Sequence, residues 1–482
     1  MKKLLSLILS MAMVFSLTAM SFAADTTYTI TINNATPGHT YEAYQIFSGD
    51  LSSTGVLSNI KWGSGVKAEG QSALGNVATK AEAIKTTADA EAFAKEVSKY
   101  LASPAGSTSE MNNEQYKITG LQPGYYLVKD KDASLAGSND AYTSYVLKVV
   151  KNVTVNPKSS TPTSEKKVID TNDSTGETTD WQDSADYDIG DKVPFQLKGT
   201  VAADYDKYKV YKFTFHDKES TGLTFNNDVK VYVDGTLITD GYRVVASAID
   251  GYTFDVVFDN LKDIPSVHAG SVITVEYTST LNEKAQLGKP GNPNTMYLEY
   301  SNNPNDEQGG ETGETPKDTV IVFTYKTIVN KVDGGNNPLT GAEFTLEKKV
   351  GNSWIAIKVV KNTEGTQFTF SGLDDGIYRL TETKTPEGYN TIDPIEFEIV
   401  AGHDTLADNP TLNSLNGNIV KGEITFTPSV QEGSLSTDVV NKSGTTLPET
   451  GGIGTKIFYT VGAILVIGAG VLFVTKRRIN AE

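Results

Sequence analysis

The chain has 482 residues and a formal net charge of −17, with 42 Lys and Arg against 59 Asp and Glu, and it contains no cysteine. The acidic balance argues against a nucleic-acid partner, because such binding depends on neutralising phosphates with Lys and Arg. The missing cysteines exclude disulfides and thiol nucleophiles. The chain is also too long for one hydrophobic core, so we expect several domains.

Residues 1–23 have the pattern of a signal peptide. A basic start precedes an apolar stretch that ends at Phe22, and Ser21 and Ala23 place small residues at the two positions that a signal peptidase reads. We therefore expect export, with a mature chain that begins at Ala24.

Residues 24–158 are predicted to form a first β domain that carries one amphipathic helix. Apolar and polar residues alternate through 28–47, as in half-buried strands, whereas from 80 to 101 the apolar residues recur at helical spacing. Alternation then resumes, and the domain closes at Lys158. A stretch rich in Ser, Thr and Pro at 159–164 follows and is typical of a linker.

Two further β domains are predicted after the linker. Residues 165–326 contain roughly eight short alternating segments separated by turns, which is the pattern of a β-sandwich. Residues 327–443 are expected to form the third domain. We therefore expect an all-β chain of tandem immunoglobulin-like sandwiches.

Residues 444–482 combine a short motif, an apolar run and a basic cluster. The apolar run Ile457 to Val474 has 18 residues, enough for about 27 Å of helix against a bilayer core of roughly 30 Å. The basic cluster after it is expected on the cytoplasmic side, which places the rest of the chain outside the cell. The motif before it consists of Leu447, Pro448, Glu449, Thr450 and Gly451.

This order of motif, span and charges resembles the cell-wall sorting signal of Gram-positive surface proteins. In that family a sortase cysteine cuts between the residues that match Thr450 and Gly451 and passes the Thr carboxyl to an amine. The resemblance implies a surface protein that is held in the membrane only until a sortase acts, and is finally attached to peptidoglycan by a housekeeping sortase. A permanent single-pass anchor with a chance motif is the alternative.

Lys158 matches the lysine that accepts this carboxyl in wall-anchored pilins. In those pilins the lysine follows a β-branched run and usually a Tyr-Pro pair, whereas here Asn156 and Pro157 precede it. The resemblance implies that a class C sortase joins Thr450 of one copy to Lys158 of the next. A solvated surface lysine without a function is the alternative.

The second and third domains resemble Cna-A-type and Cna-B-type pilin domains. In these families a lysine of the first strand bonds to an asparagine near the domain end, with the help of an acid. The resemblance assigns to the third domain Lys331, Glu382 and Asn441. It assigns to the second domain Lys166, Asp217 and Asn302, and it leaves Lys167 and Asn303 open as alternatives.

The expected reaction depends on burial. An apolar core lowers the pKa of a lysine and raises that of a carboxylic acid, so the amine becomes a neutral nucleophile and the acid polarises the amide carbonyl. The alternative is an exposed ion pair worth about 0 to 1 kcal/mol. The first domain has Asp130 at the matching acid position but no lysine in the strand 28–32. We therefore expect a similar sandwich there without a cross-link.

Other chemistry is sparse. The four histidines lack ligand-like spacing, and no cofactor is expected. Acidic stretches at 170–188 and 305–314 are interpreted as solvated loops, with calcium binding left open. We expect the major subunit of a covalently polymerised pilus that adheres to surfaces and carries minor pilins, and a single self-modification in place of enzymatic turnover. The alternative is a monomeric wall-anchored adhesin.

Overall fold

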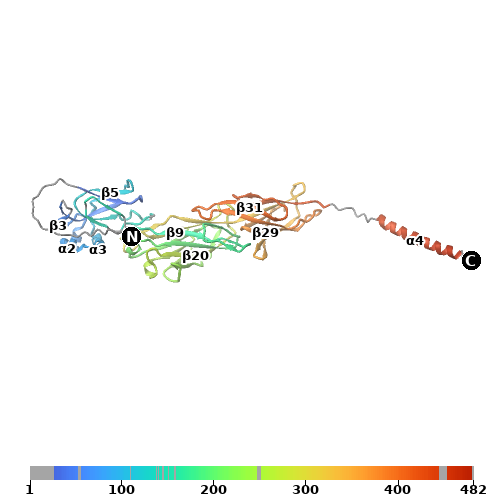
Figure 1. Cartoon of the computed structure of the whole chain (residues 1–482), viewed down its shortest axis with the longest axis horizontal. Helices are drawn as coiled ribbons and strands as arrows, with labels where there is room; N and C mark the ends of the chain where they lie inside the picture. Colours follow the sequence, from blue (N-terminus) through green and yellow to red (C-terminus); the bar gives the residue numbers. More distant parts are fainter. Residues whose placement is uncertain are drawn as a thin grey trace, which may run out of the picture.

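The computed structural model describes residues 27–444 and 453–479, with gaps at 53–55, 109, 137, 139, 144–145, 150, 157–158 and 247–250. The predicted signal peptide, Lys158 and the sorting motif lie outside the described residues. Figure 1 shows three strand-rich units in a row, followed by the helix α4. The predicted all-β fold of tandem domains is confirmed.

The first unit has two sheets and a group of short helices. One sheet has the order β5-β1-β8, and the other has β3-β2-β6-β7 with β4 paired to β2. Their bounds are β1 (Tyr28–Asn33), β2 (Tyr41–Leu51), β3 (Leu57–Trp62), β4 (Gly106–Thr108), β5 (Gln115–Leu121), β6 (Gly124–Asp130), β7 (Val146–Val149) and β8 (Val153–Val155).

The single helix expected over 80–101 is divided into the end of α2 (Val77–Ala83), α3 (Thr87–Val97) and the 3-10 turn η1 (Ser98–Tyr100). A further helix, α1 (Ala68–Leu74), precedes them. The division falls at Thr86, which is extended and forms a capping box with Asp89, so a new helix begins there. The predicted amphipathic packing is confirmed, since Phe93 is buried and stacks on Phe47 of β2 at 5.5 Å between ring centroids.

The second unit is a two-sheet sandwich. One sheet has the order β12-β23-β21-β14-β19-β18 with β22 beside β21, and the other has β17-β16-β20-β13-β9 with β15 beside β20. Strand β20 alternates strictly between buried and half-buried residues, so one of its faces lines the core. The bounds are β9 (Thr163–Val168), β10 (Thr171–Asn172), β11 (Glu177–Thr178), β12 (Ser184–Asp186), β13 (Lys192–Thr200), η2 (Tyr205–Lys207), β14 (Phe213–Glu219), β15 (Leu223–Phe225), β16 (Lys230–Val233), β17 (Thr236–Ile238), β18 (Arg243–Ala246), β19 (Phe254–Phe258), η4 (Leu261–Asp263), β20 (Val272–Leu281), β21 (Asn292–Ser301), β22 (Thr312–Glu314) and β23 (Asp318–Phe323).

The third unit is a smaller sandwich with the sheet orders β27-β28-β24-β33-β32 and β26-β25-β29-β30-β31. Its first strand β24 and last strand β33 are parallel neighbours, which brings the two ends of the unit together. The bounds are β24 (Tyr325–Asp333), β25 (Glu343–Val350), β26 (Ser353–Ile357), β27 (Val359–Lys361), β28 (Gln367–Leu373), β29 (Gly376–Lys384), β30 (Ile395–His403), β31 (Leu412–Lys421), β32 (Thr427–Ser429) and β33 (Ser434–Asn441).

Helix α4 (Ile453–Ile479) follows the third unit and contains the predicted apolar run. Among the residues whose side chains the structure describes, no helix combines the length and the hydropathy needed to cross a membrane.

Candidate cross-linking sites

The third unit brings Lys331, Glu382 and Asn441 together inside its sandwich. Lys331 pairs with Val439 across β24 and β33, and Asn441 pairs with Asp333. Glu382 stands on β29 of the facing sheet. Lys331 and Asn441 are fully buried, and Glu382 is 5% exposed. The three residues expected from the sequence therefore share one buried site.

The contacts in this site place the acid beside the amide. Asn441 Nδ2 donates to Glu382 Oε2 at 3.0 Å, while Glu382 Oε1 and Asn441 Oδ1 have no hydrogen-bond partner among the described residues. Lys331 Nζ donates to the carbonyls of Val332 and Val439, each at 2.9 Å. Burial lowers the pKa of Lys331 to about 8, against the attraction of Glu382. The amine is therefore more readily deprotonated than an ordinary lysine.

The second unit holds an analogous buried group around Lys166 of β9. Its Nζ is ion-paired with Asp217 Oδ2 of β14 and donates to the Tyr277 hydroxyl of β20 at 2.8 Å. The Tyr277 hydroxyl donates to Asp217 Oδ2 at 2.9 Å. Lys166 and Asp217 are fully buried. Burial lowers the pKa of Lys166 against the charge of Asp217, and raises the pKa of Asp217, which favours the neutral amine and the neutral acid.

The amide of this second site belongs to Asn294. Its Nδ2 donates to the Tyr277 hydroxyl at 2.9 Å, its side chain is fully buried, and its Oδ1 has no hydrogen-bond partner within the described part of the chain. Asn294 lies opposite Glu219 in the β14–β21 ladder, two positions from the pair of Asp217 with Met296. It therefore reaches the same hydroxyl as the lysine.

The structure places Asn302, the amide expected from the sequence, away from this site, and Asn294 lies at the Tyr277 hydroxyl instead. The Asn302 Nδ2 donates to the carbonyls of Leu135 and Asp140 in the first unit, at 2.9 and 3.2 Å. Asn302 follows the end of β21, eight residues after Asn294, which is about 27 Å at roughly 3.4 Å per residue. Asn303, the alternative, donates to Glu311. Asn302 instead joins the first unit to the second.

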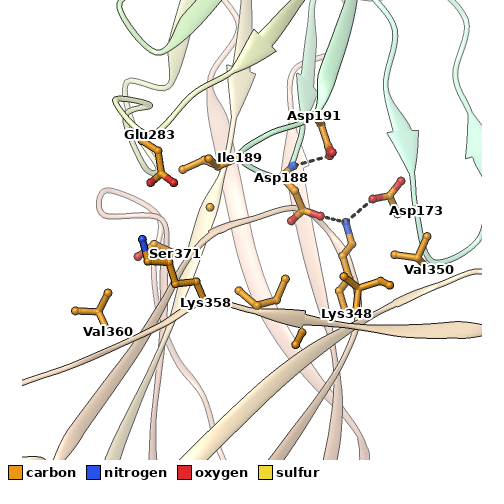
Figure 2. Close-up of a pocket in the computed structure, with 14 residues that line it drawn as sticks. Asp173, Asp188, Ile189, Asp191, Glu283, Lys348, Val350, Lys358, Val360 and Ser371 are labelled. Atoms are coloured by element: carbon orange, nitrogen blue, oxygen red, sulfur yellow. Dashed lines mark hydrogen bonds and ion pairs between the residues drawn. The ribbon is translucent and has the colours of Figure 1, made fainter.

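The other buried or nearby lysines have different environments. Lys167, the alternative to Lys166, is partly exposed and pairs with Asp183 at 2.5 Å. Lys348 is buried, but its Nζ lies 2.6 Å from Asp188 (Figure 2) and 2.9 Å from Asp374, and these charges raise its pKa in spite of burial. Lys348 is therefore a fixed cation, whereas Lys166 and Lys331 are suited to act as nucleophiles.

The first unit pairs its acid with a histidine. Asp130 Oδ1 lies 2.7 Å from His39 Nδ1, and Asp140 Oδ2 lies 2.9 Å from His39 Nε2. His39 is fully buried and stacks on Tyr41. Burial lowers the pKa of His39, but the hydrogen bonds to the two acids outweigh it and raise the pKa to about 9. The sequence analysis identified Asp130 and missed its partner, since the two are 91 residues apart.

Comparison with protein families gives three matches along the chain. Residues 189–304 match the family described as Gram-positive pilin backbone subunit 2, Cna-B-like domain. Residues 326–410 match a prealbumin-like fold domain, and residues 439–480 match the LPXTG cell wall anchor motif. The chain therefore has the domains of a Gram-positive backbone pilin together with a cell-wall anchor motif. The matched middle domain of the pilin is described as Cna-B-like, whereas the sequence resemblance predicted a Cna-A type.

Known relatives agree with these matches. The pilin is 27% identical over 395 residues to the trypsin-resistant surface T6 protein of Streptococcus pyogenes serotype M6, covering 67% of this chain and 70% of that protein. Its fold is similar to the T6 backbone pilin of S. pyogenes, with a TM-score of 0.59, 20% identity, and coverage of 88% of this chain and 100% of that one. It is also similar in fold to the major pilin SpaD from Corynebacterium diphtheriae, with a TM-score of 0.52, 18% identity, and coverage of 88% and 99%.

Proposed function

We propose that the pilin is the major subunit of a covalent fibre and that it cross-links itself at two sites, Lys331–Asn441 and Lys166–Asn294. The observation that carries this proposal is the burial of each lysine beside an acid and an amide. Lys331 Nζ attacks Cγ of Asn441, a C–N bond forms, and the bond to Nδ2 breaks. One proton passes from Nζ through Glu382 to Nδ2, which leaves as ammonia.

The second site performs the same reaction with Asp217 as the proton carrier. Tyr277 holds both reacting nitrogen atoms at its hydroxyl, so it positions the lysine and the amide. Each bond ties an early strand of its unit to a late one, and a pulling force then passes through covalent bonds in place of the sheet hydrogen bonds. Each reaction occurs once per chain, as self-modification.

Polymerisation is proposed to proceed through Thr450 and Lys158. A class C sortase cuts after Thr450 and joins its carboxyl to Lys158 of the next copy, while α4 holds the subunit in the membrane until assembly. A housekeeping sortase then attaches the fibre, with its minor pilins, to peptidoglycan. The anchor match at 439–480 supports the sortase step.

Two measurements test the proposal. The intact mass of the purified pilin is expected to be about 34 Da below the sequence mass, about 17 Da of ammonia for each bond. Boiled wall extracts are expected to show a ladder of covalent multimers that disappears in Lys158→Ala and persists in the control Lys151→Ala. A mass equal to the sequence contradicts the internal bonds, and a single band in the parent strain supports a monomeric adhesin.

A further inference from the structure

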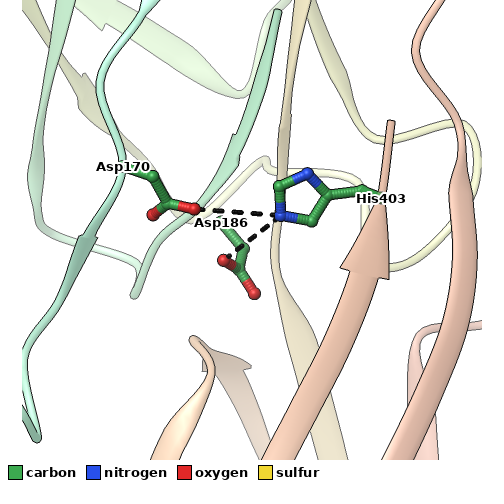
Figure 3. Close-up of side chains that lie close together, drawn as sticks. All are labelled: Asp170, Asp186 and His403. Carbon is green, nitrogen blue, oxygen red and sulfur yellow. Dashed lines mark ion pairs between the residues drawn. The ribbon is translucent and has the colours of Figure 1, made fainter. Parts of the chain in front are cut away.

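We propose that a divalent transition-metal ion binds at the junction of the second and third units, with Asp170, Asp186 and His403 as ligands. Figure 3 shows the two carboxylates and the imidazole converging on one point. Asp186 belongs to β12 of the second unit, and His403 is the last residue of β30 in the third. The ion therefore ties the two units together.

The distances suit a shared cation. His403 Nε2 lies 3.8 Å from Asp170 Oδ2 and 3.7 Å from Asp186 Oδ1, which is too long for direct hydrogen bonds. Two ligand atoms that each sit about 2.0 to 2.2 Å from one metal ion are separated by distances of this size. The three ligand atoms all lie within 4.8 Å of one another.

The hydrogen bonds of Ser184 fix the orientation of the imidazole. Ser184 Oγ has one proton and donates it to the carbonyl of Asp404, so at the 2.7 Å contact it accepts from His403 Nδ1. In the neutral ring, Nε2 then carries a lone pair that faces the carboxylates of Asp170 and Asp186. A lone pair facing two anions is repulsive unless a cation lies between them, and a second ring nitrogen held in this way is typical of metal-binding histidines.

The nearby lysine does not neutralise the negative charge of Asp170 and Asp186. Lys348 pairs with Asp173 and Asp188 (Figure 2) and with Asp374, and so it already supplies a cation to this neighbouring acidic group. Asp170 Oδ1 and Asp186 Oδ2 have no hydrogen-bond partner among the described residues.

An independent observation comes from Tyr325 of β24. Its side chain is fully buried, and its hydroxyl, which lies beside Asp186, has no hydrogen-bond partner in the described part of the chain. A buried polar atom without a partner costs about 1 to 3 kcal/mol. The pocket therefore holds a buried oxygen atom that a bound ion can contact.

The donor set indicates the class of metal. Imidazole with two carboxylates suits Zn²⁺ or Mn²⁺, whereas Ca²⁺ and Mg²⁺ prefer oxygen ligands alone. The sequence analysis interpreted the segment 170–188 as a solvated loop. In the structure this segment instead packs on the third unit, where the backbone N–H of Asp183 donates a hydrogen bond to the carbonyl of Thr405 at 2.9 Å. A metal at this position stiffens the joint through which a pulled fibre transmits force.

The test uses the full chain in detergent micelles, stripped with EDTA and titrated separately with ZnCl₂, MnCl₂ and CaCl₂ in a calorimeter. We expect one Zn²⁺ or Mn²⁺ per chain and a higher thermal midpoint with metal. Asp186→Asn and His403→Gln are expected to weaken binding at least tenfold, while the control Asp191→Asn, in the neighbouring acidic group, binds as the parent does. Near-ultraviolet circular dichroism checks that each variant is folded.

Titration with CoCl₂ adds a spectroscopic readout for the imidazole. The visible absorption of the bound Co²⁺ is expected to change in folded His403→Gln. The proposal is overturned if the parent binds neither Zn²⁺ nor Mn²⁺ at millimolar concentration, if folded Asp186→Asn binds as tightly as the parent, or if Ca²⁺ alone binds and does so equally in His403→Gln.

Discussion

Lys166 and Asn294 meet at the hydroxyl of Tyr277, which lies 2.8 Å from the amine and 2.9 Å from the amide nitrogen. They come from the strands β9 and β21, which lie in opposite sheets of the sandwich. One hydroxyl therefore holds both reacting groups, with Asp217 beside it. A cross-link between them closes a loop of about 128 residues, which on the chain-entropy model stabilises the unit by roughly 4 to 5 kcal/mol.

Replacing Asn294 is therefore expected to abolish the bond in the second unit. In Asn294→Ala the intact mass, corrected for the substitution, is expected to rise by about 17 Da relative to the parent, because no ammonia is lost there. Asn302→Ala is the matched control, since it removes an amide that follows the opposite end of β21 and faces the first unit. A deficit that is lost in Asn302→Ala and kept in Asn294→Ala would contradict the assignment.

The structure brings together all three residues that the sequence analysis assigned to the third unit, whereas in the second unit it brings Asn294 to the lysine in place of Asn302, for a physical reason. Lys331, Glu382 and Asn441 each lie in a distinct local motif, and alternation fixes which face of its strand each one occupies. Asn294 and Asn302 are an even number of residues apart, so alternation assigns both to the same face of the strand and does not distinguish them. The antiparallel register against β14 decides between them, and that pairing is not encoded in either segment alone.

The clusters at His39 and His403 were missed for a related reason. His39 meets Asp140 across 101 residues, and His403 meets Ser184 across 219 residues. Ligand spacing in sequence detects only sites whose members are close along the chain. A site that forms where two sandwiches touch can be predicted only when the order of the strands and the contact between the units are known.

Glu382 is expected to be required for the bond in the third unit. In Glu382→Ala no side chain carries the proton of Lys331 to the leaving nitrogen of Asn441, so the bond does not form and no ammonia is lost from this unit. The intact mass of the chain, corrected for the substitution, is then about 17 Da higher than that of the parent. Losing a link across about 110 residues lowers the free energy of unfolding of this unit by roughly 4 to 5 kcal/mol. Calorimetry of Glu382→Ala should show the lower midpoint, and the exposed control Glu387→Ala should match the parent.

His39 is expected to make the first unit sensitive to alkaline pH. Its pKa in the folded chain is about 9, above the ordinary value of 6.5, so the folded chain binds the proton more tightly than the unfolded chain. The stabilisation is complete below about pH 6.5 and is lost as the pH rises through about 9. The groups that face the ring are Asp130, Asp140, Tyr41 and Tyr116.

The measurement is the thermal midpoint of the first unit between pH 6 and pH 10, recorded for the parent and for His39→Gln. The parent midpoint should fall across this range, and the slope should flatten in His39→Gln. His268→Gln is the control because that side chain is 70% exposed. Equal slopes in the parent and His39→Gln would show that the ion pairs of His39 do not control the stability of this unit.

Lys348 is expected to hold the second and third units together as a buried cation. Its Nζ contacts Asp173 and Asp188 of the second unit (Figure 2) and Asp374 of the third. Lys348→Met keeps most of the volume but leaves these carboxylates without their cation, and breaking a buried ion pair in this way costs about 3 to 5 kcal/mol. We expect faster proteolysis at the junction and a lower thermal midpoint. Lys358→Met, on the exposed rim of the same pocket, should behave as the parent does, and an unchanged midpoint in Lys348→Met would show that the junction does not depend on this charge.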